Sequence, residues 1–562
     1  MKFSKIIILL FICLVSCKNR PSTTLRGTLA KNAMVVSARK EASEIGVQIL
    51  KQGGNAFDAM MATEMALAVV YPYAGNLGGG GFLVYRLADG TKGALDYREK
   101  APLAAYKDMY LDDKGNVIKD LSTVGSKAVG VPGTIAGIFE AQRKHGRLDV
   151  ETILQPVIDL AQNGFVVTQH QANRFAAYDS IFEAVNGKQL IFNKSISAGD
   201  TLKNLALANT LKRISSYGEN DFYNGEIAEV LVDYFKAKGS VITAEDLKKY
   251  KPKWRNPITF KYDDLVITSM SPPSSGGICL GQIMKMIEPF DLNEYNHNSL
   301  KYIQVLVEAE KRAYADRSYY LGDPDFVGIP TETLLSDNYL EERMSTFSFG
   351  TPTPSNELSY GKISGYESDE TTHYSIVDQF GNAIAVTTTL NGAYGSKLYV
   401  EELGFFLNNE MDDFSSKPGV PNTYGLIGAE ANSIAPEKRM LSAMTPTIVE
   451  KEGKLYMTLG TPGGSTIITS VLQTILNVHE FGFSMQEAIN APRFHHQWLP
   501  DEIRMEPNSF DKNLMNQLEH LGYPINQTRS SIIGKVDGVL VLPNGTLEGG
   551  ADYRGDDTAL GF

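Results

Sequence analysis

Hydrophobic residues recur at helical spacing over much of the first two thirds of the chain. Between 41 and 51 the apolar residues lean to one side of a helix, which Gly53 and Gly54 end. Asn55 can cap a second helix that runs to 69. The same spacing predicts further helices at 132–144, 150–163, 226–239, 243–250, 276–287 and 299–319.

Short runs rich in Val, Ile and Thr predict paired strands, most of them in the last third of the chain. We expect a strand pair at 82–86 and 93–97, a hairpin at 373–377 and 383–390 around a turn at 379–382, a second hairpin at 445–449 and 455–460, and then a helix at 465–480. The chain therefore mixes helices with antiparallel strands.

The most informative junction lies between residues 347 and 372. Residues 347–370 are polar, rich in Ser, Thr, Gly and Pro, and without periodicity, which predicts an exposed, mobile segment. A core strand that opens on Thr371 and Thr372 follows directly.

The first residues predict a targeting segment. Lys2 and Lys5 precede an apolar run at 6–15, which is too short to span a bilayer but fits a signal peptide. The run ends in Leu14-Val15-Ser16-Cys17, which resembles a bacterial lipobox. We expect a signal peptide at 1–16, lipidation of Cys17, a tether at 17–28, and a periplasmic or cell-surface lipoprotein. The alternative is an ordinary signal peptide with a chance cysteine.

Length, charge and cysteine content narrow the picture further. At 562 residues, the chain is long enough for two closely packed halves or one large α/β unit. Its net charge is −12 and no basic run follows the N-terminus, so we do not expect a nucleic-acid partner. Cys13 would leave with the signal peptide and Cys17 would be lipidated, which leaves Cys279 without a disulfide partner.

Thr371 is the candidate nucleophile. A threonine hydroxyl needs a base beside it. If the bond between Glu370 and Thr371 is cut, the freed α-amine lies on the same residue and, with a pKa of about 8, can accept the proton. A Thr-Thr-His triplet alone is weak evidence for a nucleophile, because such triplets are common by chance. Its position at the start of a strand, directly after a polar segment, strengthens the assignment.

Two further segments suit an acyl-transfer site. Residues 461–465 read Thr-Pro-Gly-Gly-Ser between a strand and a helix, where backbone N–H groups can hold an oxyanion. A plain strand–helix turn is the alternative. Residues 408–414 gather acids that could hold an ammonium or a metal, or form a solvated turn. Metal is the weaker choice because the spacing matches no known metal motif.

Other signals favour structural roles. The glycines at 78–81 lack the Lys of a phosphate loop and suit close backbone packing. His495 and His496 are adjacent, so they point apart and make a poor metal pair. His373 lies on the opposite strand face from Thr372. We expect no metal and no cofactor, and the absence of Gly-x-Ser-x-Gly disfavours a Ser-His-Asp hydrolase.

From residue 29 to the end, the chain resembles the γ-glutamyltransferases of the N-terminal nucleophile hydrolase superfamily. The motifs that carry the resemblance are Gly53-Gly54-Asn55-Ala56-Phe57-Asp58-Ala59, Gly75-Asn76-Leu77-Gly78-Gly79-Gly80-Gly81-Phe82, Asp96-Tyr97-Arg98-Glu99, Tyr314-Ala315-Asp316-Arg317 before Leu321-Gly322-Asp323-Pro324, Thr371-Thr372-His373-Tyr374-Ser375, and Asn490-Ala491-Pro492-Arg493-Phe494-His495-His496-Gln497.

The resemblance implies an α+β fold, a four-layer αββα sandwich. Two subunits would share it, a large one at 29–370 and a small catalytic one at 371–562, made by self-cleavage and held as a heterodimer. It implies transfer of the γ-glutamyl group of glutathione or related amides to water or to amino-acid and peptide acceptors.

The resemblance also implies a role for each matched position. Thr371 is the nucleophile, supported by the hydroxyl of Thr389, and Gly463 and Gly464 form the oxyanion hole. The glutamyl α-carboxylate is held by Arg98 and Ser442, and its α-amine by Asn391, Glu410 and Asp413, while Tyr424 is placed in a lid at 418–432. A zwitterionic head group fits such an arrangement, because a cation holds one end and acids the other.

The chain departs from the family pattern at two positions. Ala443 follows Ser442 where bacterial members often have a second serine, and Glu410 stands where some have glutamine. The nearest alternative is an acylase of the same superfamily, against which the charged residues argue because many such acyl groups lack an ammonium. A catalytically silent binding lipoprotein is the alternative of a different class, and the intact Thr371 and Thr389 argue against it.

Overall fold

Two stacked antiparallel sheets form the centre of the molecule in the computed structural model, which describes residues 25–358, 371–415, 417, 429–528 and 532–562. The first sheet has the order β21(Thr558–Gly561), β2(Met34–Ser37), β10(Thr372–Val377), β11(Ala383–Thr389), β3(Gly80–Arg86), β4(Lys92–Asp96), β7(Lys253–Arg255). The second has the order β1(Thr28–Ala30), β20(Leu547–Gly550), β19(Asp537–Val541), β15(Lys454–Gly460), β14(Thr447–Lys451), β9(Leu265–Ser269), β8(Ile258–Tyr262).

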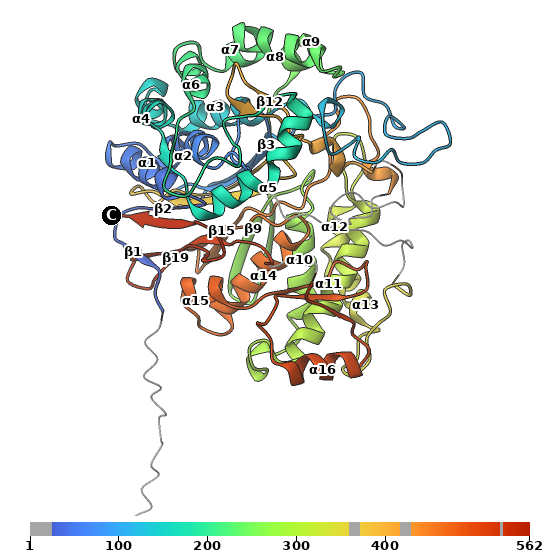
Figure 1. The fold of residues 1–562 in the computed structure, drawn as a ribbon. Coiled ribbons are helices and arrows are strands. Elements are labelled where there is room, and N and C mark those ends of the chain that lie inside the picture. The colour runs from blue at the N-terminus through green and yellow to red at the C-terminus, as the bar shows by residue number, and fades with distance from the viewer. Residues whose placement is uncertain (1–24, 359–370, 416, 418–428, 529–531) are drawn as a thin grey trace, which may run out of the picture.

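Helices cover the outer face of each sheet (Figure 1). On the first sheet lie α1(Lys40–Lys51), α2(Ala56–Val70) and α3(Thr134–His145), with α4(Val150–Asn163), α5(Gln169–Asn186), α6(Leu205–Tyr217), α7(Glu219–Asn224), α8(Glu226–Ala237) and α9(Ala244–Lys249) beyond them. On the side of the second sheet lie α10(Gly276–Ile287), α11(Leu300–Tyr320), α12(Thr331–Leu334), α13(Asp337–Met344), α14(Thr466–His479), α15(Met485–Asn490) and α16(Lys512–His520).

Smaller elements complete the described chain. They are the strand pairs β5(Phe165–Val166) with β6(Thr201–Leu202) and β12(Tyr399–Val400) with β13(Phe405–Phe406), the three-stranded sheet β16(Phe494–His495), β17(Ile503–Met505) and β18(Ile525–Asn526), and the short 3₁₀ helices η1(Ser126–Ala128), η2(Leu292–Glu294), η3(Glu410–Asp413) and η4(Glu430–Asn432).

The hydrophobic core follows these layers. One cluster fills the space between α1, α2 and the first sheet, a second joins the second sheet to α10, α11 and α14, and a third lies between the two sheets. Within the first of these, β10 and β11 present Tyr374 and Val386 toward α2. The predicted mixture of helices and antiparallel strands is confirmed, with both sheets covered by helices on their outer faces.

Most predicted elements are present. The hairpin of β10 and β11, the hairpin of β14 and β15, and α10 agree with the predicted ranges to within three residues. At α2, Asn55 accepts hydrogen bonds from the N–H groups of Phe57 and Asp58, and the Asp58 side chain accepts one from the Asn55 N–H, which closes a capping box.

The prediction of an exposed segment at 347–370 holds for most of residues 347–358, which are exposed or half-buried, but not for Ser355 and Leu358. The Ser355 backbone is held on both sides: its N–H donates to Asp501 at 2.8 Å and its carbonyl accepts from Trp498 Nε1 at 2.8 Å. Ser355 and Leu358 are buried. The segment folds because a buried Trp and a carboxylate from a distant part of the chain supply partners. Residues 359–370 lie outside the described residues.

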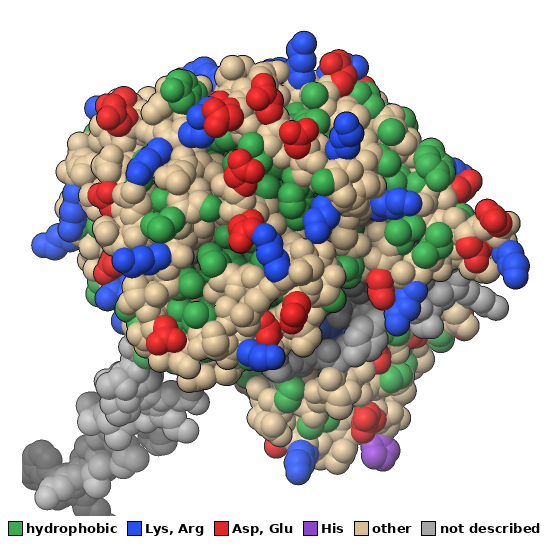
Figure 2. Space-filling model, turned by 45° about the horizontal axis from the view of Figure 1, so that its top comes forward, with side chains coloured by type: hydrophobic (Ala, Val, Ile, Leu, Met, Phe, Trp, Pro, Cys, Tyr) green, Lys and Arg blue, Asp and Glu red, His purple; other side chains and the backbone are tan. Residues whose placement is uncertain are grey.

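Two composition-based expectations can be compared with the structure. Cys279 is a buried free thiol, the one cysteine among the described residues. On the face drawn in Figure 2, acidic and basic side chains are interspersed. Within the described ranges, every helix is too short or too polar to span a bilayer.

Candidate active site

One pocket collects nearly all the predicted site residues. It opens where the end of β11 approaches the start of β10, η3 and the N-terminus of α14. Its lining consists of Arg98, Arg317, Thr371, Thr389, Asn391, Glu410, Asp413, Ser442, Ala443, Met444, Gly464 and Ile467. Gly463 does not line the pocket but directly precedes Gly464, which does. Glu370, Tyr424 and Cys17 lie outside the described residues.

Strand register brings the two threonines together. Thr372 is opposite Thr388 in the β10–β11 ladder, so the next pair beyond the end of the ladder is Thr371 and Thr389. Both are buried and line the pocket. The Thr389 hydroxyl accepts a hydrogen bond from the Asn391 N–H at 2.7 Å, which fixes its position. Asn391 itself has φ +71°, a conformation that Asn tolerates better than most residues.

The glycine run holds Thr389 in place. Asn76 Nδ2 donates to the Thr389 carbonyl at 2.9 Å, and Asn76 Oδ1 accepts from the Gly79 N–H at 2.8 Å. A Cβ atom at Gly79 would overlap the Thr389 carbonyl oxygen, and one at Gly80 would lie 2.6 Å from Glu99 Oε2. The predicted role of this run in close backbone packing is therefore confirmed.

The charged residues form one tight cluster. The Arg98 guanidinium pairs with Glu410 and Asp413, and its Nη1 lies 3.9 Å from Glu99 Oε2. The sequence predicts that cation and acids hold opposite ends of a ligand, whereas here they are in direct contact. η3 places both acids, and Asn408 Oδ1 fixes its start by accepting the Glu410 N–H at 3.0 Å.

Burial governs the electrostatics of this cluster. Burial raises the pKa of Glu99, Glu410 and Asp413, and Arg98 only partly opposes it. For Arg98, burial lowers the pKa, but Glu410 and Asp413 more than offset this and raise it. Three carboxyl groups around one guanidinium share its charge, so they titrate together and not as independent groups.

Ser442 and Ala443 form the opposite wall. The Ser442 N–H donates to the Pro273 carbonyl at 2.8 Å, and the Ser442 carbonyl accepts from Ser275 N and Oγ at 2.8 and 2.7 Å. The Ser442 hydroxyl accepts from the Met444 N–H at 3.1 Å. This wall therefore rests on the loop before α10, which belongs to the N-terminal part of the chain.

Arg317 is a pocket residue to which the sequence analysis assigned no role. It lies in the last turn of α11, is buried, and donates from Nε to Ser275 Oγ at 2.8 Å. Burial lowers its pKa. Its place in the motif Tyr314-Ala315-Asp316-Arg317 was the available signal, but nothing in the sequence indicates that the end of α11 reaches the pocket.

The Thr-Pro-Gly-Gly-Ser segment forms the predicted junction between β15 and α14. Gly463 has φ +134° and Gly464 has φ +54°, which side chains disfavour. The Gly463 carbonyl is held by Thr466, whose N–H and hydroxyl donate to it at 3.0 and 2.8 Å. Gly464 therefore brings backbone at a helix N-terminus to the pocket wall beside Thr371, as an oxyanion hole requires.

The histidines near the site have side-chain partners. His373 is buried between Thr387 and Ser375, at 2.9 and 3.0 Å, and burial lowers its pKa to about 3. His495 contacts Thr469 at 2.8 Å, while His496 contacts Asp501 at 3.2 Å. The two adjacent histidines therefore have separate partners, which fits the structural roles expected for them.

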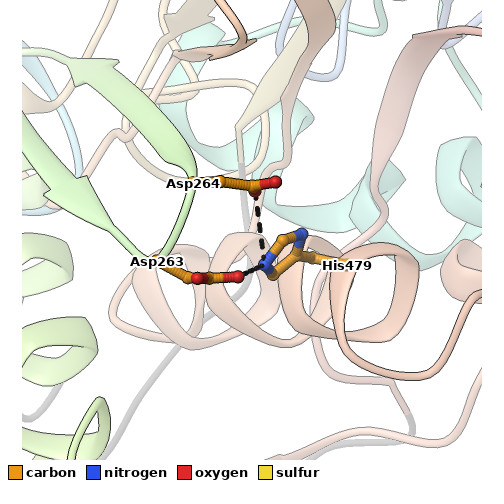
Figure 3. Close-up of side chains that lie close together, drawn as sticks. All are labelled: Asp263, Asp264 and His479. Carbon is orange, nitrogen blue, oxygen red and sulfur yellow. Dashed lines mark hydrogen bonds and ion pairs between the residues drawn. The ribbon is translucent and has the colours of Figure 1, made fainter.

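A separate cluster away from the pocket brings possible metal ligands together. Figure 3 shows Asp263 and Asp264, in the turn between β8 and β9, pointing at His479 at the end of α14. His479 Nε2 lies 2.9 Å from Asp263 and 3.8 Å from Asp264. Lys451 Nζ already pairs with Asp264 at 2.9 Å. A lysine on the same carboxylate marks an ion-pair cluster that joins the turn to α14.

The chain matches known proteins over nearly its whole length. The family model described as gamma-glutamyltranspeptidase matches residues 42–562. The chain is 45% identical over 538 residues to the glutathione hydrolase proenzyme of Escherichia coli strain K12, covering 95% of this chain and 92% of the relative. It is 34% identical over 554 residues to the acylase ACY 1 proenzyme of Pseudomonas sp. strain V22, covering 97% and 95%.

A solved structure supports the fold. The cephalosporin acylase of Bacillus halodurans superposes with a TM-score of 0.83 over 98% of this chain and 99% of that one, at 24% identity. That likeness concerns the fold alone. Because the family model covers nearly the whole chain, and a relative at 45% identity is matched over almost its full length, the chain belongs to the γ-glutamyltranspeptidase family.

Proposed function

We propose that this protein is a γ-glutamyltransferase and glutathione hydrolase that cleaves its own precursor between Glu370 and Thr371. The observation that carries the proposal is the pocket itself. Thr371 heads a core strand beside Thr389, and the same pocket holds a buried cluster of Arg98, Glu410 and Asp413. No cofactor is needed for this chemistry.

Self-cleavage makes the nucleophile. The Thr371 hydroxyl attacks the Glu370 carbonyl carbon, the peptide C–N bond breaks, and an ester links Glu370 to Thr371 Oγ. The hydroxyl proton passes to the departing nitrogen, so this shift frees the Thr371 α-amine. Water then hydrolyses the ester, which gives Glu370 a free carboxylate and restores the Thr371 hydroxyl. Two subunits result, 29–370 and 371–562 of the mature chain, and together they form the N-terminal nucleophile hydrolase sandwich.

Acyl transfer then uses the new N-terminus. The Thr371 α-amine takes the hydroxyl proton as Oγ bonds to the γ-carbonyl carbon, and backbone N–H groups at Gly463 and Gly464 stabilise the oxyanion. The C–N bond breaks and the amine leaves with a proton, as cysteinylglycine when glutathione is the donor. Water or an acceptor amine attacks the glutamyl ester and restores Thr371.

Substrate recognition rests on the charge cluster. The α-carboxylate of the glutamyl group binds Arg98 and Ser442, and its ammonium binds Asn391, Glu410 and Asp413. Because Arg98 pairs with both acids in the structure, the substrate carboxylate must share the guanidinium with them, while the ammonium supplies the acids with a new cation.

An acylase is the second candidate, favoured by the acylase relative. An acyl group without an α-ammonium would leave the buried acids of η3 without their second cation, which costs free energy. Rates on glutathione and on a glutaryl amide, which keeps the α-carboxylate of the γ-glutamyl group but lacks its α-amino group, separate the two functions. Faster cleavage of the glutaryl amide would replace the proposed function with an acylase.

The nucleophile can be tested directly. Thr371→Ala should remain a single chain on denaturing electrophoresis and should not cleave glutathione, because no hydroxyl attacks Glu370. Thr371→Ser should cleave itself more slowly and give two bands. Efficient cleavage at this bond in the alanine variant would contradict an intramolecular nucleophile.

We also propose export and attachment to a membrane through a diacylated Cys17, on the basis of the lipobox-like segment 14–17. Cys17→Ala should move the activity from the membrane to the soluble fraction and abolish labelling by a radioactive fatty acid. A variant that still sediments with membranes would place the anchor elsewhere.

A further inference from the structure

A buried acid without a cation lies directly behind the nucleophile strand. Glu64 is in the middle of α2, a helix whose 15 residues are all buried. Its side chain has no exposed surface, and neither carboxyl oxygen has a hydrogen-bond partner among the described residues. The proposed chemistry does not use it. A buried carboxyl group of this kind is costly and calls for a physical explanation.

The Glu64 carboxyl faces the nucleophile end of the first sheet. Alternation places Thr372 and Tyr374 on the α2 side of β10, and Thr388 on the same side of β11, opposite Thr372. The Tyr374 and Thr388 hydroxyls lie close enough to lower the Glu64 pKa, although neither forms a hydrogen bond of normal geometry with the carboxyl group. The Thr372 and Tyr374 hydroxyls are also buried without a hydrogen-bond partner in the described part of the chain. Thr371 is the next residue along the strand.

Burial raises the pKa of Glu64 to about 7, and the Thr388 and Tyr374 hydroxyls oppose the rise. Burial raises the pKa of the Tyr97 hydroxyl, and the charges of Glu64 and Glu99 both raise it further. The charged or titratable side chains that the other helices bring to α2 are all partly or fully exposed: Lys40, Glu41, Glu44 and Lys51 of α1, Glu140, Arg143, Lys144 and His145 of α3, and Glu151 and Asp159 of α4. None of these acts on the Glu64 pKa.

We propose that Glu64 is a positioning residue for Thr371. Its carboxyl group, buried without a cation, packs behind the start of β10 and the end of β11 and keeps the strand end that carries the nucleophile in place. Ionisation places an unpaired charge in this layer and displaces the strand end that carries the nucleophile. The inference deepens the proposed function, because it concerns the same site. It predicts that self-cleavage falls as the carboxyl loses its proton. Turnover should fall in the same pH range relative to a variant that stays neutral at position 64, because the Thr371 α-amine must itself be unprotonated to act as the base.

Glu64→Gln tests this, because glutamine keeps the shape and stays neutral at every pH. Precursor is purified from the Glu64→Gln chain and from the wild type, and self-cleavage is followed by denaturing electrophoresis from about pH 6 to about pH 9. The two rates should agree within about twofold at about pH 6, and the variant should be faster by about fivefold or more at about pH 9. The kcat for glutathione should follow the same ratio.

A matched control separates this role from a general effect of a buried acid. Glu310 of α11 is also fully buried, on the other side of the sheets, and burial raises its pKa well above the usual range. Glu310→Gln should leave the pH dependence of self-cleavage unchanged. A rate ratio of wild type to Glu64→Gln that stays constant with pH would overturn the proposal, even if melting temperatures differ.

Two further outcomes are decisive. If Glu64→Gln does not fold, Tyr374→Phe tests the same contact. Loss of the hydroxyl raises the Glu64 pKa further, so the fall in the self-cleavage rate at alkaline pH should move to higher pH. A fall at the same pH as in the wild type would overturn the proposal. Self-cleavage needs no γ-glutamyl compound. If glutathione is not cleaved but self-cleavage shows the predicted ratio, the proposed substrate is wrong and the role of Glu64 stands.

Discussion

Ala443 is the residue at which this pocket differs most simply from the bacterial pattern. It lines the pocket next to Ser442, with its carbonyl held by the Thr445 hydroxyl at 2.8 Å. A serine at position 443 would add a hydroxyl to the wall that, in the proposed function, faces the substrate carboxylate.

We therefore expect Ala443→Ser to lower KM for glutathione several-fold with kcat little changed, since one added hydrogen bond contributes about 0.5–1.5 kcal/mol to ground state and transition state alike. Steady-state kinetics of the processed enzyme measure this, with Ala443→Gly as the control for the effect of size. An unchanged or higher KM would show that position 443 packs against protein and does not contact the substrate.

At this scale the sequence predicted the identity of most pocket residues but not their contacts. Motif matching placed Arg98, Glu410 and Asp413 in the site, and the structure brings them together. Their mutual pairing could not be predicted, because it depends on η3 and the end of β4 meeting in three dimensions. Arg317 was missed for the same reason, because its motif does not show that the end of α11 reaches the pocket.

The glycine run at the start of β3 is the element that brings Thr389 to Thr371. Gly79 passes so close to the end of β11 that a side chain there would overlap the Thr389 carbonyl oxygen. β3 also pairs with β11 along its whole length, so a shift at its start moves the second threonine.

Gly79→Ala should therefore destabilise the fold by about 1–3 kcal/mol or more, the usual effect of an added group in a packed core, and slow self-cleavage strongly. Chemical denaturation and the time course of the two fragments measure these effects. Gly453→Ala is a control for the loss of a glycine, because its Cβ meets no atom within 4 Å and any effect comes from its φ of +72° alone. Normal cleavage in Gly79→Ala would show that the close approach does not position Thr389.

Not every helix was predicted: α5, α6 and α16 match none of the expected elements, and in α5 polar residues interrupt the buried face. In α5 the buried face includes Gln171 and Asp179 beside Phe175 and Phe182, so the helix has no continuous apolar side in the sequence. The anchoring of Ser355 was not predicted because its partners, Trp498 and Asp501, come from far along the chain. Long-range contacts of this kind leave no local pattern.

Each of the two large sheets contains strands from both sides of the predicted cleavage point. In the first sheet β2 pairs with β10 and β21, and β3 pairs with β11. In the second, β9 pairs with β14 and β1 with β20. The last residue takes part as well, because the Phe562 carbonyl accepts the N–H groups of Lys31, Asn32 and Ala33. Neither fragment alone contains all the strands of either large sheet.

The two fragments should therefore stay together after cleavage. Separating them would break hydrogen-bonded ladders in both sheets and expose the core cluster that lies between the sheets, which contains residues from both fragments. We expect fully processed protein to elute from a sizing column at the volume of uncleaved Thr371→Ala, with both fragments in one peak, and to separate only in strong denaturant. Mixing fragments that were denatured and refolded apart should recover little activity, because each alone leaves long strand edges unpaired. Separate elution of the fragments without denaturant would mean that the strands on either side of residue 371 are not held in shared sheets.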